Sequence, residues 1–262
     1  MKKAYHQKHP EDGKGQVFLH GEKESTRINK YLADCDFCSR RGAEEYITEG
    51  RVTIDGEIAM MGSQVFTGQQ VMVDEQIITK MQTQVYIALN KPVGITCTLE
   101  QTKAGNIGDF MGFEPRVFPI GRLDKDSSGL ILLTNDGDIV NKILHAENNH
   151  EKEYIVEVDK AISPMFIEKL KTGVEITNMR TKNRVVTKKS KVERVNANCF
   201  KITLTQGLNR QIRRMCTELG YRVTALQRVR IMNIELGNLK VGHWRYLTQK
   251  ELTQLADSIG EA

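Results

Sequence analysis

The pattern of apolar and polar residues divides the chain into a short N-terminal part and a longer C-terminal part. In the short part, one apolar stripe has the i, i+3, i+4, i+7 spacing of an amphipathic helix: Ile28, Tyr31, Leu32 and Cys35. A second helix is predicted to start at Ser39, which can cap it, to run through Ile47 and to end at Gly50. Two consecutive short helices are therefore expected.

A hairpin is predicted to follow these helices. Residues 52–57 form a strand that runs into an Asp-Gly turn, and residues 71–73 supply another strand. Helices and hairpin together predict a small domain at residues 25–75. Residues 76–84, with Gln and Thr around a few apolar positions, predict a linker.

The longer part, residues 85–262, alternates strands with a few helices. Strands are predicted at residues 85–90, 129–135 and 153–159. Helices are predicted at residues 138–145, from Ser163 to Gly173, and after a capping box formed by Thr248 and Glu251. This order predicts an α+β fold with a largely antiparallel sheet.

Residues 1–24 show no periodicity and predict a flexible N-terminal tail. The tail holds three of the six histidines, but their irregular spacing favours a solvated tail over a metal-binding tract. Cys35 and Cys38 have C-x-x-C spacing, yet no second pair of ligands follows and Cys35 already belongs to the apolar helix stripe. No metal site is predicted.

Length and composition narrow the class of protein. With 262 residues, 39% of them apolar, the chain can bury a sizeable core and form two domains. No apolar run approaches the roughly 18 residues of a membrane span, and the N-terminus lacks the apolar region of a signal peptide. The five thinly spread cysteines are typical of a reducing cytoplasm. A cytoplasmic protein without a membrane partner is expected.

The charge distribution suggests an anionic partner. The net charge is +5, and residues 180–194 carry seven Lys or Arg against one acid, while residues 205–230 carry six Arg against one acid. A solvated basic face remains an equal alternative for residues 180–194. In the second predicted helix, Arg40 and Arg41 oppose the helix dipole, a cost that a bound phosphate would offset. Because residues 25–75 hold nine acids and five bases, any positive surface there must be a single face.

Candidate chemistry centres on the stretch from Gly121 to Leu130. Asp124 lies where a loop enters the apolar strand that starts near residue 129. A carboxylate on a loop anchored by a buried strand is well placed for catalysis. Asp, Ser and Gly are also ordinary turn residues, so spacing alone leaves a structural turn as an open alternative.

Four motifs in a fixed order resemble the pseudouridine synthases of the RsuA family. They are Gly-Arg-Leu-Asp at 121–124 followed by Gly-Leu, the Leu-Asn-Lys-Pro-Val-Gly stretch at 89–94, Glu-Lys-Glu-Tyr at 151–154, and residues 207–215. The residues around them are most similar to the RluF-type synthases of that family, which act on large-subunit ribosomal RNA. The resemblance implies the mixed-sheet fold of the family, behind an N-terminal S4 domain.

The short N-terminal part is similar to the S4 RNA-binding fold. The similarity lies in residues 27–32, 38–41 and 50–52. It implies that RNA contacts five basic residues there: Arg27, Lys30, Arg40, Arg41 and Arg51.

The family resemblance also implies roles for residues of the longer part. Asp124 would be the essential carboxylate, acting either as nucleophile or as base, and Arg213 would pair with it. Tyr154 would cover the base and help remove the C5 proton, although an alternating strand residue can equally be core. Three more arginines are RNA-binding candidates: Arg122, Arg210 and Arg214. The last two share a predicted helix face with Arg213, capped by Asn209, and a solvated basic face is the alternative.

These implications predict an enzyme that isomerises a specific uridine of 23S ribosomal RNA to pseudouridine. No cofactor is expected, because the reaction oxidises nothing and the sequence lacks a P-loop and a dinucleotide fingerprint. The alternatives are the same reaction on another ribosomal or transfer RNA site, or a non-catalytic ribosome-associated RNA-binding protein. A monomer is expected.

Overall fold

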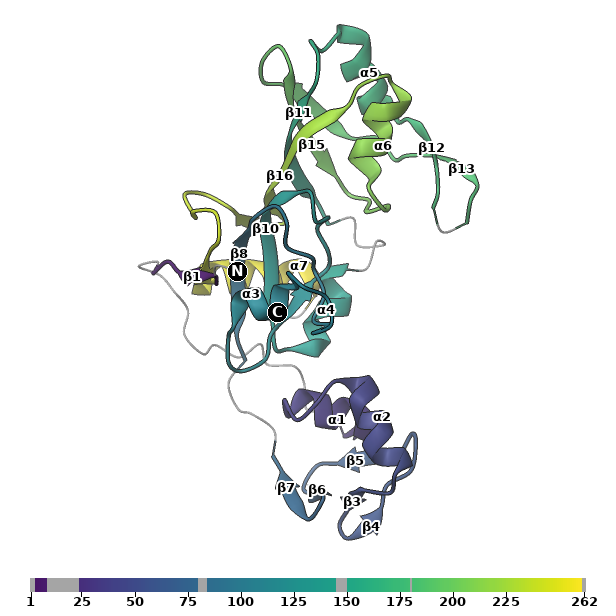
Figure 1. Ribbon diagram of the computed structural model, residues 1–262, viewed down its shortest axis with the longest axis vertical. Helices are drawn as coiled ribbons and strands as arrows, with labels where there is room; N and C mark the ends of the chain where they lie inside the picture. Colours follow the sequence, from purple (N-terminus) through teal and green to yellow (C-terminus); the bar gives the residue numbers. More distant parts are fainter. Residues whose placement is uncertain (1–2, 9–23, 80–83, 145–149, 180, 261–262) are drawn as a thin grey trace.

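A computed structural model describes residues 3–8, 24–79, 84–144, 150–179 and 181–260 (Figure 1). In this part of the chain, no helix is long and apolar enough to cross a membrane.

The N-terminal part folds around a small core of its own. Its elements are β2 (Ser25–Arg27), α1 (Ile28–Asp34), α2 (Arg40–Thr48), β3 (Val52–Ile54), β4 (Glu57–Ile58), β5 (Gln64–Phe66), β6 (Val71–Val73) and β7 (Gln76–Ile78). Ser39 caps α2 by accepting a hydrogen bond from Gly42 N at 3.0 Å, as predicted. Strands β4, β3, β6 and β7 form one sheet, so residues 76–78 of the predicted linker are a strand.

The longer part is built on a ten-stranded mixed sheet. Its strands are β1 (Tyr5–His6), β8 (Tyr86–Lys91), β9 (Phe118–Ile120), β10 (Ser128–Thr134), β11 (Lys152–Val158), β14 (Lys191–Arg194), β15 (Cys199–Leu204), β16 (Val223–Ile231), β17 (Ile234–Glu235) and β18 (His243–Tyr246). The main order is β1-β18-β8-β10-β16-β11-β15-β14. Among the strand pairs that the described residues form in this sheet, only β1·β18 and β10·β16 are parallel. The predicted α+β class with a largely antiparallel sheet is confirmed.

Helices and a second hairpin complete this part (Figure 1). They are α3 (Ile107–Met111), α4 (Gly137–Leu144), α5 (Pro164–Thr172), α6 (Gln211–Glu218), α7 (Gln249–Ile259), and the hairpin β12 (Glu175–Thr177) with β13 (Arg184–Val186). Helix α5 starts with the predicted Ser163 cap. The predicted Asn209 cap of α6 is wrong: Arg210 is the cap residue, in a left-handed conformation with φ 48°, and it makes no side-chain cap bond.

The sheet carries three hydrophobic cores. The first packs α4 and α7 against one face of β8 and β10, the second packs α3 against the other face of the same two strands, and the third packs α5 and α6 against β11 and β15. Strand β16 contributes to the first and the third core and so joins them. The parallel contact between β10 and β16 is only two residue pairs long, Ser128 with Gln227 and Gly129 with Arg228. The loop that carries Asp124 ends at this junction.

The beginning of the chain differs from the predicted tail. Residues Tyr5 and His6 form β1, which pairs in parallel with His243 and Trp244 at the edge of the sheet. The ring of His6 stacks on Trp244 with centroids 4.2 Å apart. A two-residue strand has no readable periodicity, which is why the sequence did not reveal it. The other histidines of the predicted tail lie outside the described residues.

Helix α7 is held by a largely buried ion pair. Both guanidinium Nη atoms of Arg245 donate to the Glu251 carboxylate, at 2.8 and 2.7 Å, and Thr248 completes the predicted capping box. Removing one partner of such a pair leaves a buried charge uncompensated. We therefore expect Glu251→Ala to lower the free energy of unfolding by about 3 kcal/mol. Urea denaturation would measure it, and Lys250→Ala, at an exposed neighbour, is the control. Equal stability of the two variants would contradict this expectation.

Candidate active site

The loop that carries Asp124 joins β9 to β10 and is fixed by its backbone. Ser127 N donates to Asp124 O at 3.1 Å, and Gly94 N donates to Lys125 O at 2.7 Å. The second bond ties the loop to the turn after β8. Gly94 forms this turn with a φ of 93°, a conformation that suits glycine. The Asp124 side chain is 32% exposed, so its carboxylate can reach a substrate from a rigid support.

Two arginines of the α6 region meet this loop, but they bind Asp126 rather than Asp124. Arg210 forms a two-pronged ion pair with Asp126, with both N···O distances 2.9 Å. Arg213 Nη2 donates to the Asp126 carbonyl oxygen at 2.8 Å and to Ser127 Oγ at 3.2 Å. The hydrogen bonds from Arg210 are the main cause that lowers the pKa of Asp126.

The predicted pairing of Arg213 with Asp124 is therefore not what the structure has. The arginine close to Asp124 is Arg210, with Nη1 3.7 Å from Oδ2. The physical reason is the reach of each side chain: Arg213 lies against the backbone at the end of the loop, whereas Arg210 is placed by its left-handed cap conformation beside both carboxylates. The sequence motif named the right helix but assigned the contact to the wrong arginine.

Tyr154 lies in β11 beside this junction. It pairs with Arg228 of β16 on one side and with Ile202 of β15 on the other. Its ring is half-buried against the core that includes α5 and α6. The hydroxyl makes no hydrogen bond within the described part of the chain.

Sequence reasoning missed three charged groups near the loop: Lys91, Asp126 and Arg228. Lys91 is fully buried, and its Nζ donates to the carbonyl oxygens of Pro92 and Ile95 at 2.8 and 2.9 Å. Burial is the main cause that lowers the pKa of Lys91 to about 8. Lys91 and Asp126 lie inside the motif stretches but had no assigned role, and Arg228 lies in the arginine-rich residues 205–230, which suggested an anionic partner.

Two other RNA-binding candidates of the longer part, Arg122 and Arg214, differ in whether their side chains are free to bind RNA. The side chain of Arg122 is exposed on the loop, two residues before Asp124. The guanidinium of Arg214 instead donates to the carbonyl oxygens of Thr177 and Asn209. Arg214 therefore braces the hairpin against α6, and its predicted face shared with Arg210 is not free for RNA.

The five candidates of the short N-terminal part also fall into two groups. Lys30 contacts Asp34 and lies 3.2 Å from Asp138 of α4, while Arg51 is bound by Asp74 and Glu49. The other three are exposed and form no ion pair with a described residue: Arg27, Arg40 and Arg41.

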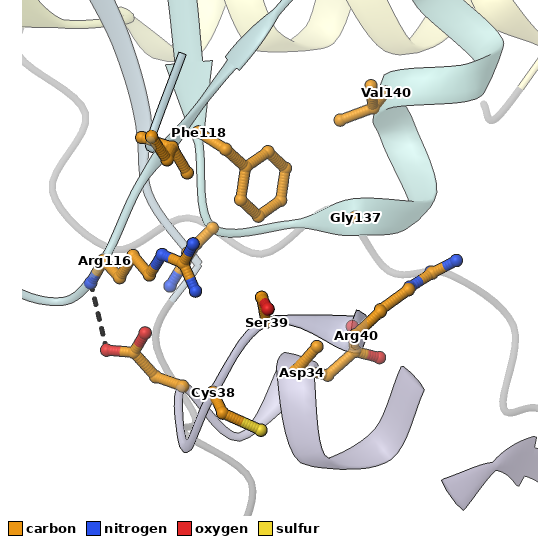
Figure 2. Close-up of a pocket in the computed structure, with 12 residues that line it drawn as sticks. Asp34, Cys38, Ser39, Arg40, Arg116, Phe118, Gly137 and Val140 are labelled. Atoms are coloured by element: carbon orange, nitrogen blue, oxygen red, sulfur yellow. Dashed lines mark hydrogen bonds between the residues drawn. The ribbon is translucent and has the colours of Figure 1, made fainter. Parts of the chain in front are cut away.

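A cavity of about 340 Å³ lies between the N-terminal helices and the sheet domain (Figure 2). Its lining includes Arg40 at the start of α2 and, from the other side, Arg116 and Phe118. Arg116 N donates to the Asp36 carboxylate at 3.0 Å across the seam. Asp124 does not line this cavity, so the seam and the candidate active site are separate features.

No metal centre is indicated in the ranges that the structure describes, since no group of three His, Cys, Asp or Glu side chains converges there. The site offers a partly exposed carboxylate, a guanidinium at 3.7 Å and a tyrosine hydroxyl free to act. The carboxylate of such a set can attack an electrophilic carbon or remove a proton, and the guanidinium can stabilise the negative charge of the carboxylate.

The site is thus a carboxylate on the loop that enters β10 of a mixed sheet, and this sheet follows a small N-terminal domain with its own core. The family model described as RNA pseudouridylate synthase matches residues 85–218, and the S4 domain model matches residues 26–65. The chain belongs to the RNA pseudouridylate synthase family and carries an S4 domain. It is an RNA pseudouridine synthase, as the motifs predicted.

Individual relatives agree with this assignment. The chain is 52% identical over 233 residues to proteins of Salmonella typhi and Escherichia coli (strain K12) named dual-specificity RNA pseudouridine synthase RluF, covering 88% of this chain and 78% of each relative. It is 33% identical over 232 residues to ribosomal large subunit pseudouridine synthase B of Bacillus subtilis (strain 168), covering 87% and 95%. A solved pseudouridylate synthase superposes with a TM-score of 0.64 at 28% identity, covering 87% and 99%. The resemblance to RluF-type synthases is confirmed.

Proposed function

We propose that the protein converts a specific uridine of 23S ribosomal RNA into pseudouridine, with Asp124 as the essential carboxylate. The observation that carries this proposal is the position of Asp124: it is partly exposed, fixed by two backbone hydrogen bonds of its loop, and faced by Arg210. The names of the relatives support the substrate, because one of them is a ribosomal large subunit synthase.

The reaction requires a group close to C1′ of the target nucleotide. The bond between uracil N1 and C1′ breaks, the base turns, and C5 joins C1′; C5 then loses its proton and N1 gains one. No electron enters or leaves the overall isomerisation. A carboxylate can promote the cleavage by attacking C1′ or by removing a sugar proton, and Asp124 is in position for either role.

The neighbouring side chains would share the remaining tasks. Arg210 would stabilise the ionised Asp124 carboxylate, the role that the sequence gave to Arg213. Arg213 would hold the loop by its backbone, and Tyr154 would cover the base and assist loss of the C5 proton. The exposed Arg122 would bind phosphate or occupy the space that the flipped nucleotide leaves.

Substrate binding would be divided between two domains. Residues 25–75 would hold RNA phosphates through Arg27, Arg40 and Arg41, whose guanidinium groups are exposed. Residues 85–262 would hold the target nucleotide, with residues 76–84 connecting the two domains.

Replacing Arg40 and Arg41 together with Ala should weaken RNA binding and lower the slope of log Kd against log salt by about one to two units, because each phosphate contact releases counterions. Neither arginine forms an ion pair with a described residue, so the fold should keep its stability. Filter binding at several salt concentrations would measure the slope. The double Lys variant keeps both charges and should keep the slope; a slope unchanged by the Ala pair would exclude this contact surface.

A second RNA substrate is supported by the RluF relatives, which are named dual-specificity RNA pseudouridine synthases. Transfer RNA is the candidate that the sequence analysis left open. Mapping pseudouridine in ribosomal and transfer RNA, from cells with and without the gene, tests both substrates at once. We expect one large-subunit uridine to lose its modification when the gene is deleted. Unchanged modification of every RNA, together with an inactive purified protein, would favour a non-catalytic RNA-binding role.

A further inference from the structure

Arg228 is a cation buried inside the sheet. It lies in β16 between β10 and β11, with 3% of its surface exposed. No acid in the described ranges lies within ion-pair distance of its guanidinium. Arginine is almost never buried without a paired charge, so other groups must hold this guanidinium in place.

Two of the guanidinium nitrogens bind backbone on either side of Asp124, one near the start of its loop and the other in β10, the strand that follows the loop. Nε donates to the carbonyl oxygen of Leu130 at 2.7 Å, and Nη1 lies 3.4 Å from that of Arg122. A guanidinium is planar and presents its donors in fixed directions. One rigid group therefore sets the separation of these two backbone positions, and with it the shape of the loop between them.

The register of the sheet places Arg228 in a row with other residues of the site. Lys91 pairs with Gly129, Gly129 with Arg228, and Arg228 with Tyr154. Residues paired directly across strands project from the same face of a sheet. Gly129 has no side chain to separate its neighbours, and a Cβ there would lie 2.2 Å from the Arg228 carbonyl oxygen. Arg228 and Tyr154 thus share one face.

The charge of Arg228 also reaches the site. Burial lowers the pKa of Lys91, and the charge of Arg228 acts in the same direction while that of Asp124 opposes it. Burial and the charge of Arg228 likewise lower the pKa of Lys152. The remaining nitrogen, Nη2 of Arg228, is buried without an acceptor among the described groups. The fold bears this unsatisfied donor, as strained or functional sites often do.

We propose that Arg228 is a positioning residue of the reaction, which clamps the backbone on either side of Asp124 and so fixes the Asp124 carboxylate relative to Tyr154. This inference rests on the proposed role of Asp124. A positioning role differs from a purely structural role in its consequence: loss of Arg228 slows the chemical step without weakening RNA binding. A displacement of about 1 Å in a reacting group can reduce a rate about a hundredfold.

Three variants separate the clamp from the charge and from general stability. Arg228→Met removes the clamp and also the unsatisfied donor, and Arg228→Lys keeps the charge but has a single nitrogen. Arg230→Met, two residues along the same strand, removes an arginine that is paired with Glu151 at 3.0 Å and is the matched control. Single-turnover rates on a transcript of large-subunit RNA, RNA Kd values and thermal unfolding are measured for each.

We expect Arg228→Met to react about a hundredfold more slowly and Arg228→Lys about tenfold more slowly, with Kd within about threefold of wild type. Arg230→Met should keep its rate within about threefold. A wild-type rate in a folded Arg228→Met protein overturns the proposal, as does an equal loss in Arg230→Met. If Arg228→Met fails to fold, Arg228→Lys decides. A full rate with lysine would mean that the charge alone suffices, and it would overturn the clamp.

A second measurement needs no RNA. Amide hydrogen exchange over residues 122–130 should become at least about tenfold faster in Arg228→Met or Arg228→Lys than in Arg230→Met, because the backbone on either side of Asp124 loses one or both contacts. Equal exchange in these variants overturns the clamp. Faster exchange in a protein whose wild type forms no pseudouridine would support the clamp and count against the proposed function, so the two failures are distinguishable.

Discussion

Asp124→Asn should abolish pseudouridine formation while RNA affinity stays within about threefold of wild type. An amide has the shape of the carboxylate, but it can neither attack C1′ nor accept a proton as readily. The substitution leaves no buried charge unpaired, because the side chain is 32% exposed and its guanidinium neighbour Arg210 remains bound to Asp126. Tritium release from RNA labelled at uridine C5 would measure turnover.

The chain offers a closely matched control for this substitution. Asp159 is also 32% exposed and also faces an arginine, with Arg222 Nε 3.8 Å from Oδ2. Asp159→Asn therefore changes the same chemistry in a similar environment away from the loop and should keep full activity. Turnover above about one percent in Asp124→Asn would remove Asp124 from the mechanism.

Local signals were sufficient to predict several elements of the fold. Ser39, Ser163 and Thr248 each cap a helix within three residues of their own position, so the sequence carried the whole interaction. Residues 130–133, which follow Asp124, are an uninterrupted apolar run, and all four are buried in β10. Motif order then identified the family, which the comparisons confirmed.

Contacts between distant residues could not be read in the same way. Strand β1 pairs with β18 near the other end of the chain, and its two residues have no pattern of their own. The partner of Arg213 depends on the direction of α6, which the left-handed backbone conformation of Arg210 sets at the start of the helix. Arg228 lies in a strand whose burial follows no regular pattern, so nothing local distinguishes it from Arg230, which is only partly buried.

Tyr154→Phe should form product at least about a hundredfold more slowly in a single turnover, with unchanged RNA affinity and almost unchanged stability. A buried tyrosine retained for structure normally gives its hydroxyl a partner. The hydroxyl of Tyr154 has no such partner within the described residues, so removing it should cost the fold little. It is free to move the C5 proton, and rapid-quench kinetics would isolate that step from product release.

Tyr221 supplies the opposite case in the same core. Its ring packs against the same cluster as Tyr154, but its hydroxyl donates to Ala161 O at 3.3 Å and accepts from Ser163 N at 3.3 Å. Tyr221→Phe should therefore lower the free energy of unfolding by about 1 kcal/mol and leave the single-turnover rate unchanged. Tyr154→Phe should therefore lower the rate but not the stability, and Tyr221→Phe should lower the stability but not the rate. A wild-type rate for Tyr154→Phe would assign Tyr154 to the core, and product formation would then depend on Asp124 and the arginines that surround its loop.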